Sequence, residues 1–382
     1  MPSTGKRRYL LLAISLLITG VFVAWFVSKQ DWPKIGRAFR TASPLYIFLS
    51  VPPMMIAYIF RVLRWKILML PVKRLSFGQL LGATLIGFTA NNLLPLRAGE
   101  FVRPAVVKAR YGTSFTSTLA TIAVERLFDL LALSVVLVFV CVFWPIPAET
   151  PDAPQQSISH EVVEPAEAAP STSETGPDRL RTFNAAKAGA FLAVMIAVLT
   201  GALLVLKHYP ETVKAVASWT MRFLPHTFQS KVLGLIDSFV VGLRFMEQLH
   251  HVLLCVLYSL GLWASVGWSM LFSAHAFGMA VSYPGACFSL LCVAVAVAMP
   301  QGPGFVGTFH YFAQASMQSL GNPAAPAAGY AILAHAIAVV PVCIGGFISL
   351  WIMGLSFGQI KRQAAGADET AQEDDQPSTD ES

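Results

Sequence analysis

Long apolar runs are the feature that most constrains how this chain can fold. Residues 130–144 and 327–355 contain no charged side chain. Because the hydrocarbon core of a bilayer is about 30 Å thick and a helix rises about 1.5 Å per residue, apolar runs of about 18 or more residues are candidate spans. The chain is 55% hydrophobic and 13% charged, and it lacks the period-two alternation of a membrane barrel. The sequence therefore predicts an all-α, polytopic membrane protein with about eight transmembrane helices, including one or two broken or re-entrant segments.

Basic residues indicate which side of the membrane the loops face. A span is predicted at Pro44–Phe60, and the stretch that follows it is basic and has no acidic residue. Further spans are predicted at Tyr9–Val27, Phe115–Trp144, Ala185–Leu206, Val252–Phe277, Val281–Met299 and Ala327–Leu355. The basic residues of the stretch after Phe60 are Arg61, Arg64, Lys66, Lys73 and Arg74. The formal net charge of +6 collects in such short loops rather than on an aromatic-interleaved surface domain, so no nucleic-acid partner is expected. We expect a multi-pass protein of the cytoplasmic (inner) membrane with both termini cytoplasmic.

Composition divides the chain into a membrane domain and polar segments. We expect the membrane domain over residues 1–362 and a disordered acidic tail over residues 363–382. Residues 145–184, rich in Pro, Ala, Ser and Glu at their start, predict a disordered extracytoplasmic loop. Residues 208–250 show helical amphipathicity and are placed along the cytoplasmic interface. A short basic amphipathic stretch, Trp32–Arg40, fits an extracytoplasmic loop poorly because basic residues favour the cytoplasmic side.

Two apolar segments are punctuated by helix-breaking residues. Phe77–Leu94 ends in Asn91 and Asn92 just before Pro95, and Gly302–Leu320 opens on a glycine-rich bend. A broken helix frees backbone groups, which the membrane tolerates only where protein or water covers them. We expect one of these segments to cross the membrane and the other to re-enter on the same side. Paired interrupted segments mark substrate sites in many transporters.

The second segment contains Gly302, Gly304 and Gly307 in the spacing of a dinucleotide fingerprint. No βαβ pattern surrounds these glycines and Pro303 lies among them, so a tight bend that approaches a neighbouring helix or a ligand is the preferred interpretation. His310 follows this bend. It is either a proton-coupling or head-group contact, or a structural histidine satisfied by hydrogen bonds.

Ionisable residues at membrane depth are the strongest functional signal. Inserting one charged side chain at the centre of a transmembrane helix costs roughly 2.5–3.5 kcal/mol of free energy, so such a residue is retained only where it is paired, hydrated or needed for function. Two interpretations stay open: a polar cavity whose arginines hold an anionic head group, and an ion-pair latch that only ties helices together. The residues concerned, which would together be neutral, are Arg97, Glu100, Arg103, Glu125, Arg126 and Asp129.

Catalytic and metal-binding patterns are missing from the sequence. There is no HExxH, no phosphate loop and no carboxylate pair beside a serine or histidine base. The five cysteines lie in apolar segments without a CxxC pair, as expected for core residues. No catalytic residue, metal or cofactor is therefore predicted.

Three motifs, taken in order, carry a resemblance to a known family. NNLLPLRAGEFVRP, VERLFDL and MPQGPGFVGTFHYF together resemble the lysylphosphatidylglycerol synthase transmembrane region, a flippase-like family, over Tyr9–Leu355. The resemblance implies a domain that moves or binds lipids. In the synthases an attached soluble domain makes the aminoacylated lipid. That aminoacyltransferase domain is missing here, so its activity is not expected.

The leading expectation is a lipid translocase or lipid-transport protein whose charged cavity, together with Asn91, Asn92 and the glycine bend, accepts a polar lipid head group. One alternative is a membrane-embedded transferase acting on a lipid-linked donor, with Glu125 or Asp129 as general base. A second is a non-catalytic assembly partner. Self-association and a membrane partner protein are both left open.

Overall fold

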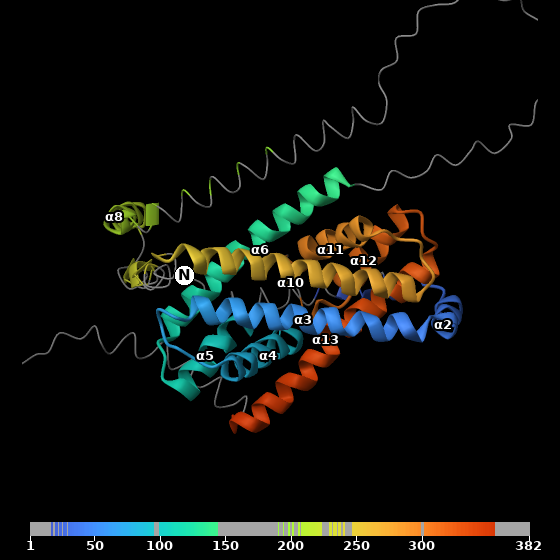
Figure 1. Ribbon diagram of the computed structural model, residues 1–382, viewed down its shortest axis with the longest axis horizontal. Coiled ribbons are helices and arrows are strands. Elements are labelled where there is room, and N and C mark those ends of the chain that lie inside the picture. The colour runs from blue at the N-terminus through green and yellow to red at the C-terminus, as the bar shows by residue number, and fades with distance from the viewer. Residues whose placement is uncertain are drawn as a thin grey trace, which may run out of the picture.

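The computed structural model describes residues 30–94, 99–143, 208–223, 247–298 and 302–355, with scattered positions between them and from residue 17. Within these ranges the chain is helical and contains no strand, which confirms the all-α prediction (Figure 1). The elements are α2 (Trp32–Thr41), α3 (Pro44–Leu68), α4 (Phe77–Leu93), α5 (Gly99–Tyr111), α6 (Phe115–Val142), α8 (Pro210–Thr220), α10 (Leu249–Ala276), α11 (Tyr283–Ala298), η2 (Pro303–Phe305), α12 (Thr308–Ser319) and α13 (Ala324–Met353).

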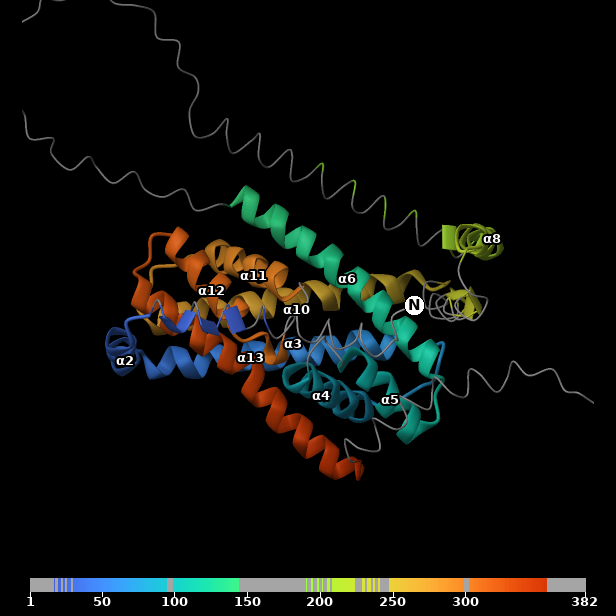
Figure 2. The same cartoon turned by 180° about the vertical axis from the view of Figure 1, so that it is seen from behind.

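Long helices that run from end to end form the frame of the bundle. Among the described residues, α3, α10 and α13 are long and apolar enough to cross a membrane. α3 and α10 lie side by side and antiparallel (Figures 1 and 2), and the amide of Ser43 before α3 donates to the carbonyl of Ala276 at the end of α10, 2.8 Å away. α6, with 28 residues, runs obliquely along this frame (Figure 1): Thr121 contacts Met69 after α3, and Phe139 packs on Tyr283, which lies beside Trp268 of α10.

The helices α4 and α5 form a hairpin that returns to the side from which it came. Lys73, just before α4, donates through Nζ to the carbonyl of Tyr111 at the end of α5, 2.5 Å away. Near the turn, the backbones of Gly87 and Gly99 lie close together. At about 1.5 Å per residue, the 17 residues of α4 extend only about 25 Å, which is too short to cross comfortably. Phe77–Leu94 is therefore re-entrant.

A second hairpin, α11–η2–α12, enters from the opposite end. Ser316 Oγ donates to Ser289 Oγ at 2.7 Å, and a Cβ placed on Gly285 would lie 3.2 Å from Leu320 Cδ1. The expectation that Val281–Met299 crosses is therefore wrong, because α11 turns back into α12. The expectation that one punctuated segment crosses while the other re-enters is also wrong, because both segments belong to hairpins that fold back. The turn is possible because the chain adopts φ 66° at Gly304 and 89° at Gly307, which glycine tolerates best.

The two hairpins meet at their turns, which we call the hairpin tips. A Cβ on Gly304 of the second hairpin would lie 3.2 Å from the carbonyl oxygen of Asn92 at the end of α4. Both tips also contact α13. His335 Nε2 donates to the Gly304 carbonyl at 2.7 Å, and Asn92 Nδ2 lies 3.7 Å from Cys343 Sγ. Two re-entrant segments from opposite ends thus converge on one crossing helix.

We expect Gly99→Ala to destabilise the protein by about 1–3 kcal/mol, the usual cost of overpacking. A Cβ there would collide with the Gly87 carbonyl oxygen and lie 2.6 Å from Asn91 Oδ1, and a backbone carbonyl cannot move aside easily. The melting temperature in detergent measures the effect. Gly78→Ala, on the open side of α4 with no atom within 4 Å, is the matched control, and equal melting of both variants would contradict the close hairpin contact.

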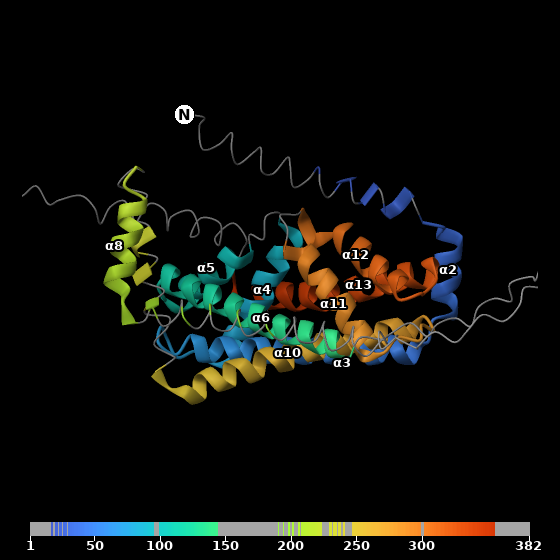
Figure 3. The same cartoon turned by 90° about the horizontal axis from the view of Figure 1, so that it is seen from above.

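Several sequence expectations lie wholly or largely outside the described residues. These are the spans at Tyr9–Val27 and Ala185–Leu206, the loop over 145–184 and the tail over 363–382. Of the amphipathic region 208–250, α8 is described; it lies across one end of the bundle, near the end of α3 and the start of α10 (Figure 3).

Candidate functional site

The end of α3 builds the centre of the site. The expectation that Arg61 and Arg64 lie in a loop after Phe60 is wrong, because α3 continues to Leu68. The two arginines lie one turn apart on a shared face and point into the bundle. The physical reason is that their carboxylate partners lie on α6, and pairing allows the helix to continue within the membrane.

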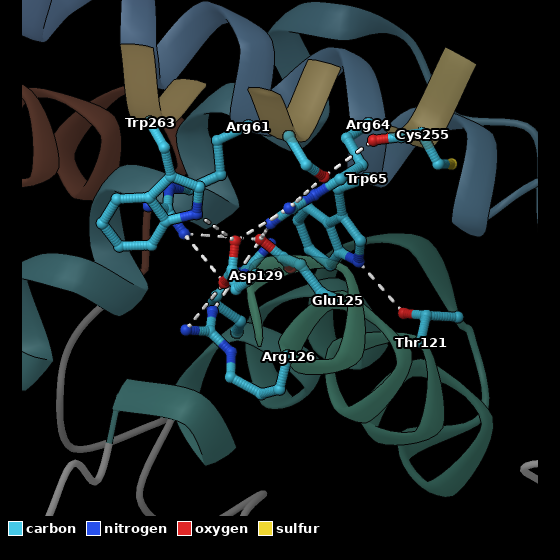
Figure 4. A network of polar contacts seen from close by, with 11 residues as sticks. Arg61, Arg64, Trp65, Thr121, Glu125, Arg126, Asp129, Cys255 and Trp263 are labelled. Atoms are coloured by element: carbon cyan, nitrogen blue, oxygen red, sulfur yellow. Dashed lines mark hydrogen bonds and ion pairs between the residues drawn. The ribbon is translucent and has the colours of Figure 1, made fainter. Parts of the chain in front are cut away.

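Arg64 holds the two carboxylates together. Its side chain is fully buried, and its two terminal nitrogens bind different acids of α6 (Figure 4). Arg64 Nη1 lies 2.8 Å from Asp129 Oδ1, and Arg64 Nη2 lies 2.9 Å from Glu125 Oε1. Arg64 Nη1 also donates to Ser259 Oγ of α10 at 2.7 Å. One guanidinium thus connects α3, α6 and α10.

Further donors surround the same carboxylates. Arg103 Nη1 of α5 lies 3.0 Å from Glu125 Oε2, and Arg126 Nη1 lies 3.2 Å from Asp129 Oδ2. Trp263 Nε1 of α10 donates to Asp129 Oδ1 at 3.2 Å. Arg61 Nη1 is more distant, at 3.6 Å from Glu125 Oε1, so it contributes charge rather than a short hydrogen bond.

Aromatic rings cover the other faces of the guanidinium groups. The Arg103 guanidinium lies 3.9 Å from the centre of the Trp65 ring, and that of Arg61 lies 4.7 Å from the centre of the Phe88 ring. Trp65 is itself held by a hydrogen bond from its Nε1 to Thr121 Oγ1, 3.0 Å away. Such cation–π contacts fix arginines in place without neutralising their charge.

Counted over the described residues, the site carries surplus positive charge. We call it the arginine cluster: Arg61, Arg64, Arg103 and Arg126 with Glu125 and Asp129. Four cations and two anions give 4 − 2 = +2. Glu100, whose charge acts on Arg126, reduces this to +1. The expectation of a neutral cluster is therefore corrected, because two arginines of α3 join it; Arg97 lies outside the described residues.

Some arginine donors of the cluster are buried but unused. Within the described part of the chain, Arg61 Nη1, Arg103 Nε and Nη2, and Arg126 Nε have no hydrogen-bond partner. The side chain of Arg103 is 3% exposed, whereas that of Arg126 is 35% exposed. The cluster therefore has a closed interior with spare donors and one arginine that solvent or lipid can reach.

The other residues predicted for the site form a second group at the hairpin tips. Among the described residues, no hydrogen bond joins this group to the arginine cluster, so the expectation of a glycine bend opposite the charged cavity is corrected: this bend packs on the end of α4 and on α13. His310 Nδ1 accepts a hydrogen bond from the Gly307 amide at 3.3 Å, and its ring centre is 4.6 Å from that of His335. The members of the group are Asn91, Asn92, Gly302, Gly304, Gly307 and His310.

One sequence signal could have revealed Arg61 and Arg64. The apolar pattern continues past them through Ile67, Leu68 and Met69, so a longer helix was readable. The two arginines, spaced i, i+3 near the end of a span, also equal in number the two carboxylates of α6, which are spaced i, i+4, so two ion pairs between these helices could have been predicted. Among the described residues no group of His, Cys, Asp and Glu could hold a metal ion.

Comparison with known proteins identifies related sequences. The family model "Lysylphosphatidylglycerol synthase TM region" matches residues 12–346. A protein named Glycosyltransferase AglD from Haloferax volcanii is 26% identical over 367 residues, which cover 94% of this chain and 57% of the relative. The chain therefore spans somewhat more than half the length of this curated relative.

Proposed function

Because the chain belongs to the lysylphosphatidylglycerol synthase TM region family, we propose that it is an integral membrane lipid translocase or lipid-transport protein that binds a polar, anionic lipid head group. One observation carries the proposal: the arginine cluster has more guanidinium groups than carboxylates, and several of its buried donors are unused. In a medium of low dielectric constant, uncompensated positive charge is costly. An anionic head group would supply the missing charge and acceptors.

The geometry suits such a ligand. Guanidinium groups bind phosphate and carboxylate through two parallel hydrogen bonds, and Arg103 has two unused nitrogens, Nε and Nη2. Arg126, which is partly exposed, gives the head group a first contact from outside. The converging hairpins add support, because interrupted helices near the midplane accompany substrate sites in many transporters.

The topology that goes with this function has both termini in the cytoplasm. The described crossings α3, α6, α10 and α13, together with the sequence-predicted spans Tyr9–Val27 and Ala185–Leu206, give an even total. Lys66, Lys73 and Arg74 are exposed at the end of the bundle where α3 finishes. By the positive-inside rule this end faces the cytoplasm.

Leaflet exchange in proteoliposomes tests the proposal. Purified protein is reconstituted with trace fluorescent lipids of anionic or zwitterionic head group, and a membrane-impermeant quencher reports which leaflet each lipid occupies. We expect protein-dependent exchange that is faster for the anionic lipid. Exchange no faster than in empty liposomes for every head group would reject the translocase function.

A transferase acting on a lipid-linked donor is the second candidate, favoured by the similarity to a protein named as a glycosyltransferase. Glu125 or Asp129 would then act as general base. Each already contacts more than one arginine, so neither could take a proton from a substrate without first losing a partner. Mass spectrometry of lipids after incubation with a lipid-linked sugar distinguishes the two: a new glycosylated product would favour the transferase.

A further inference from the structure

The helix α2 has two faces of different character. Asp31 caps it, with its side chain accepting from the Lys34 amide at 3.0 Å. The apolar face packs on the bundle: Ile35 is buried, and the Phe39 ring lies edge-on to Phe277 with ring centres 5.0 Å apart. Protein therefore covers Ile35 and one side of the Phe39 ring, although Trp32 and Phe39 stay partly exposed, and the opposite face remains to be explained.

The opposite face is basic. Lys34, Arg37 and Arg40 are spaced i, i+3, i+6, form one stripe and are all exposed. Lys34 pairs with Asp31 at 2.9 Å, and this contact holds the pKa of the Asp31 carboxyl below its usual range. Within the described part of the chain, Asp31 forms its ion pair with Lys34, and neither Arg37 nor Arg40 forms one.

The position of α2 puts this stripe at the membrane surface. α2 lies crosswise to α3 at the end of the bundle (Figure 3), next to the end of α10. The charge-free run of α3 starts at Pro44 and lasts until Arg61. Since the hydrocarbon layer must begin near Pro44, a helix that ends at Thr41 lies at the level of the lipid head groups.

We propose that Lys34, Arg37 and Arg40 of α2 bind the phosphates of anionic phospholipids in the leaflet at this end of the bundle. A basic residue close to an anionic membrane surface raises binding about five-fold. This surface is distinct from the arginine cluster, because Arg64 lies 20 residues, or about 30 Å, beyond Pro44 along α3. Lipid binding also explains basic residues at the end of the bundle where the positive-inside rule expects few.

Photocrosslinking of lipids to the full-length reconstituted protein tests the proposal. Photoactivatable phosphatidylglycerol and phosphatidylcholine are each added to the membrane, and labelled peptides are identified by mass spectrometry. We expect the peptide containing α2 to be labelled several-fold more by phosphatidylglycerol. Arg37→Gln/Arg40→Gln should remove most of that preference, because each basic residue near the surface raises binding about five-fold, whereas Arg37→Lys/Arg40→Lys should retain most of it.

The controls separate this surface from the arginine cluster. Lys66→Gln, an exposed charge at the other end of α3, and Arg126→Gln should both leave labelling of α2 unchanged, whether or not the protein exchanges lipids. Equal labelling by the two lipids would overturn the proposal. It would also be overturned if labelling by phosphatidylglycerol arose only after deletion of residues 146–178, because the acidic stretch of the same chain would then be the occupant.

Discussion

Replacing Arg64 with alanine is expected to destabilise the folded protein by about 3–5 kcal/mol, the usual cost of breaking a buried ion pair by removing one partner. Arg64 is the largest single connection in the site: it binds Glu125 of α6 at 2.9 Å, Asp129 of α6 at 2.8 Å and Ser259 of α10 at 2.7 Å. Its loss leaves two carboxylates in the membrane with fewer cations and an empty volume between three helices.

The melting temperature of purified Arg64→Ala in detergent, together with the yield of monodisperse protein, measures this effect. Lys66→Ala is the matched control, because Lys66 lies two residues further along α3 but is exposed. It should melt like the wild type. If Arg64→Ala also melts like the wild type, Arg103 and Arg126 are sufficient to pair the two carboxylates, and Arg64 does not make the main contribution to the stability of the cluster.

The second large effect is expected on function. Arg103→Gln should lower the rate of anionic lipid exchange by about 10- to 100-fold, as expected when a hydrogen bond to a charged group worth about 1.5–3 kcal/mol is lost. Arg103 has two unused buried donors, and glutamine cannot reproduce the planar bidentate fork. Folding should be affected less, because Glu125 keeps Arg64 as a partner.

Exchange assays at matched protein density test this, with the melting temperature as the check on folding. Arg110→Gln, an exposed arginine of the same helix, should exchange lipids at the wild-type rate. The exchange rate of Arg103→Lys should lie between those of the wild type and Arg103→Gln, since lysine keeps the positive charge but cannot form two parallel hydrogen bonds. A folded Arg103→Gln with undiminished exchange would mean that the cluster is an ion-pair latch.

The predicted gathering of charged residues is partly confirmed, whereas their role in binding a head group stays a prediction. The structure brings together the four expected residues Arg103, Glu125, Arg126 and Asp129. A charged side chain in an apolar helix has few possible partners other than an opposite charge on another helix. Arg61 and Arg64 were missed because basic residues at the end of a span look the same whether they enter a loop or continue a helix. Their true position depends on carboxylates more than 60 residues away in the chain.

For the two hairpins, too, the sequence predicts one property and only the tertiary structure decides another. Asn91, Pro95 and the glycines near Gly304 marked where the helices break, but not in which direction the chain continues. The direction is decided by close contacts between helices, such as Gly87 against Gly99 and Ser289 against Ser316. These contacts depend on pairs of residues, so no reading of one segment alone could find them.

The sequence by itself thus determined the helical membrane class, the main apolar helices and the existence of an ionic centre. The reason is that the free energy of placing a segment in lipid depends on the apolar length and the charges of that segment alone. Only the tertiary structure decided that both punctuated segments turn back, that α3 carries its arginines into the bundle and that the centre has a positive surplus. Those outcomes follow from which side chains meet, and that is set by packing between segments distant in the chain.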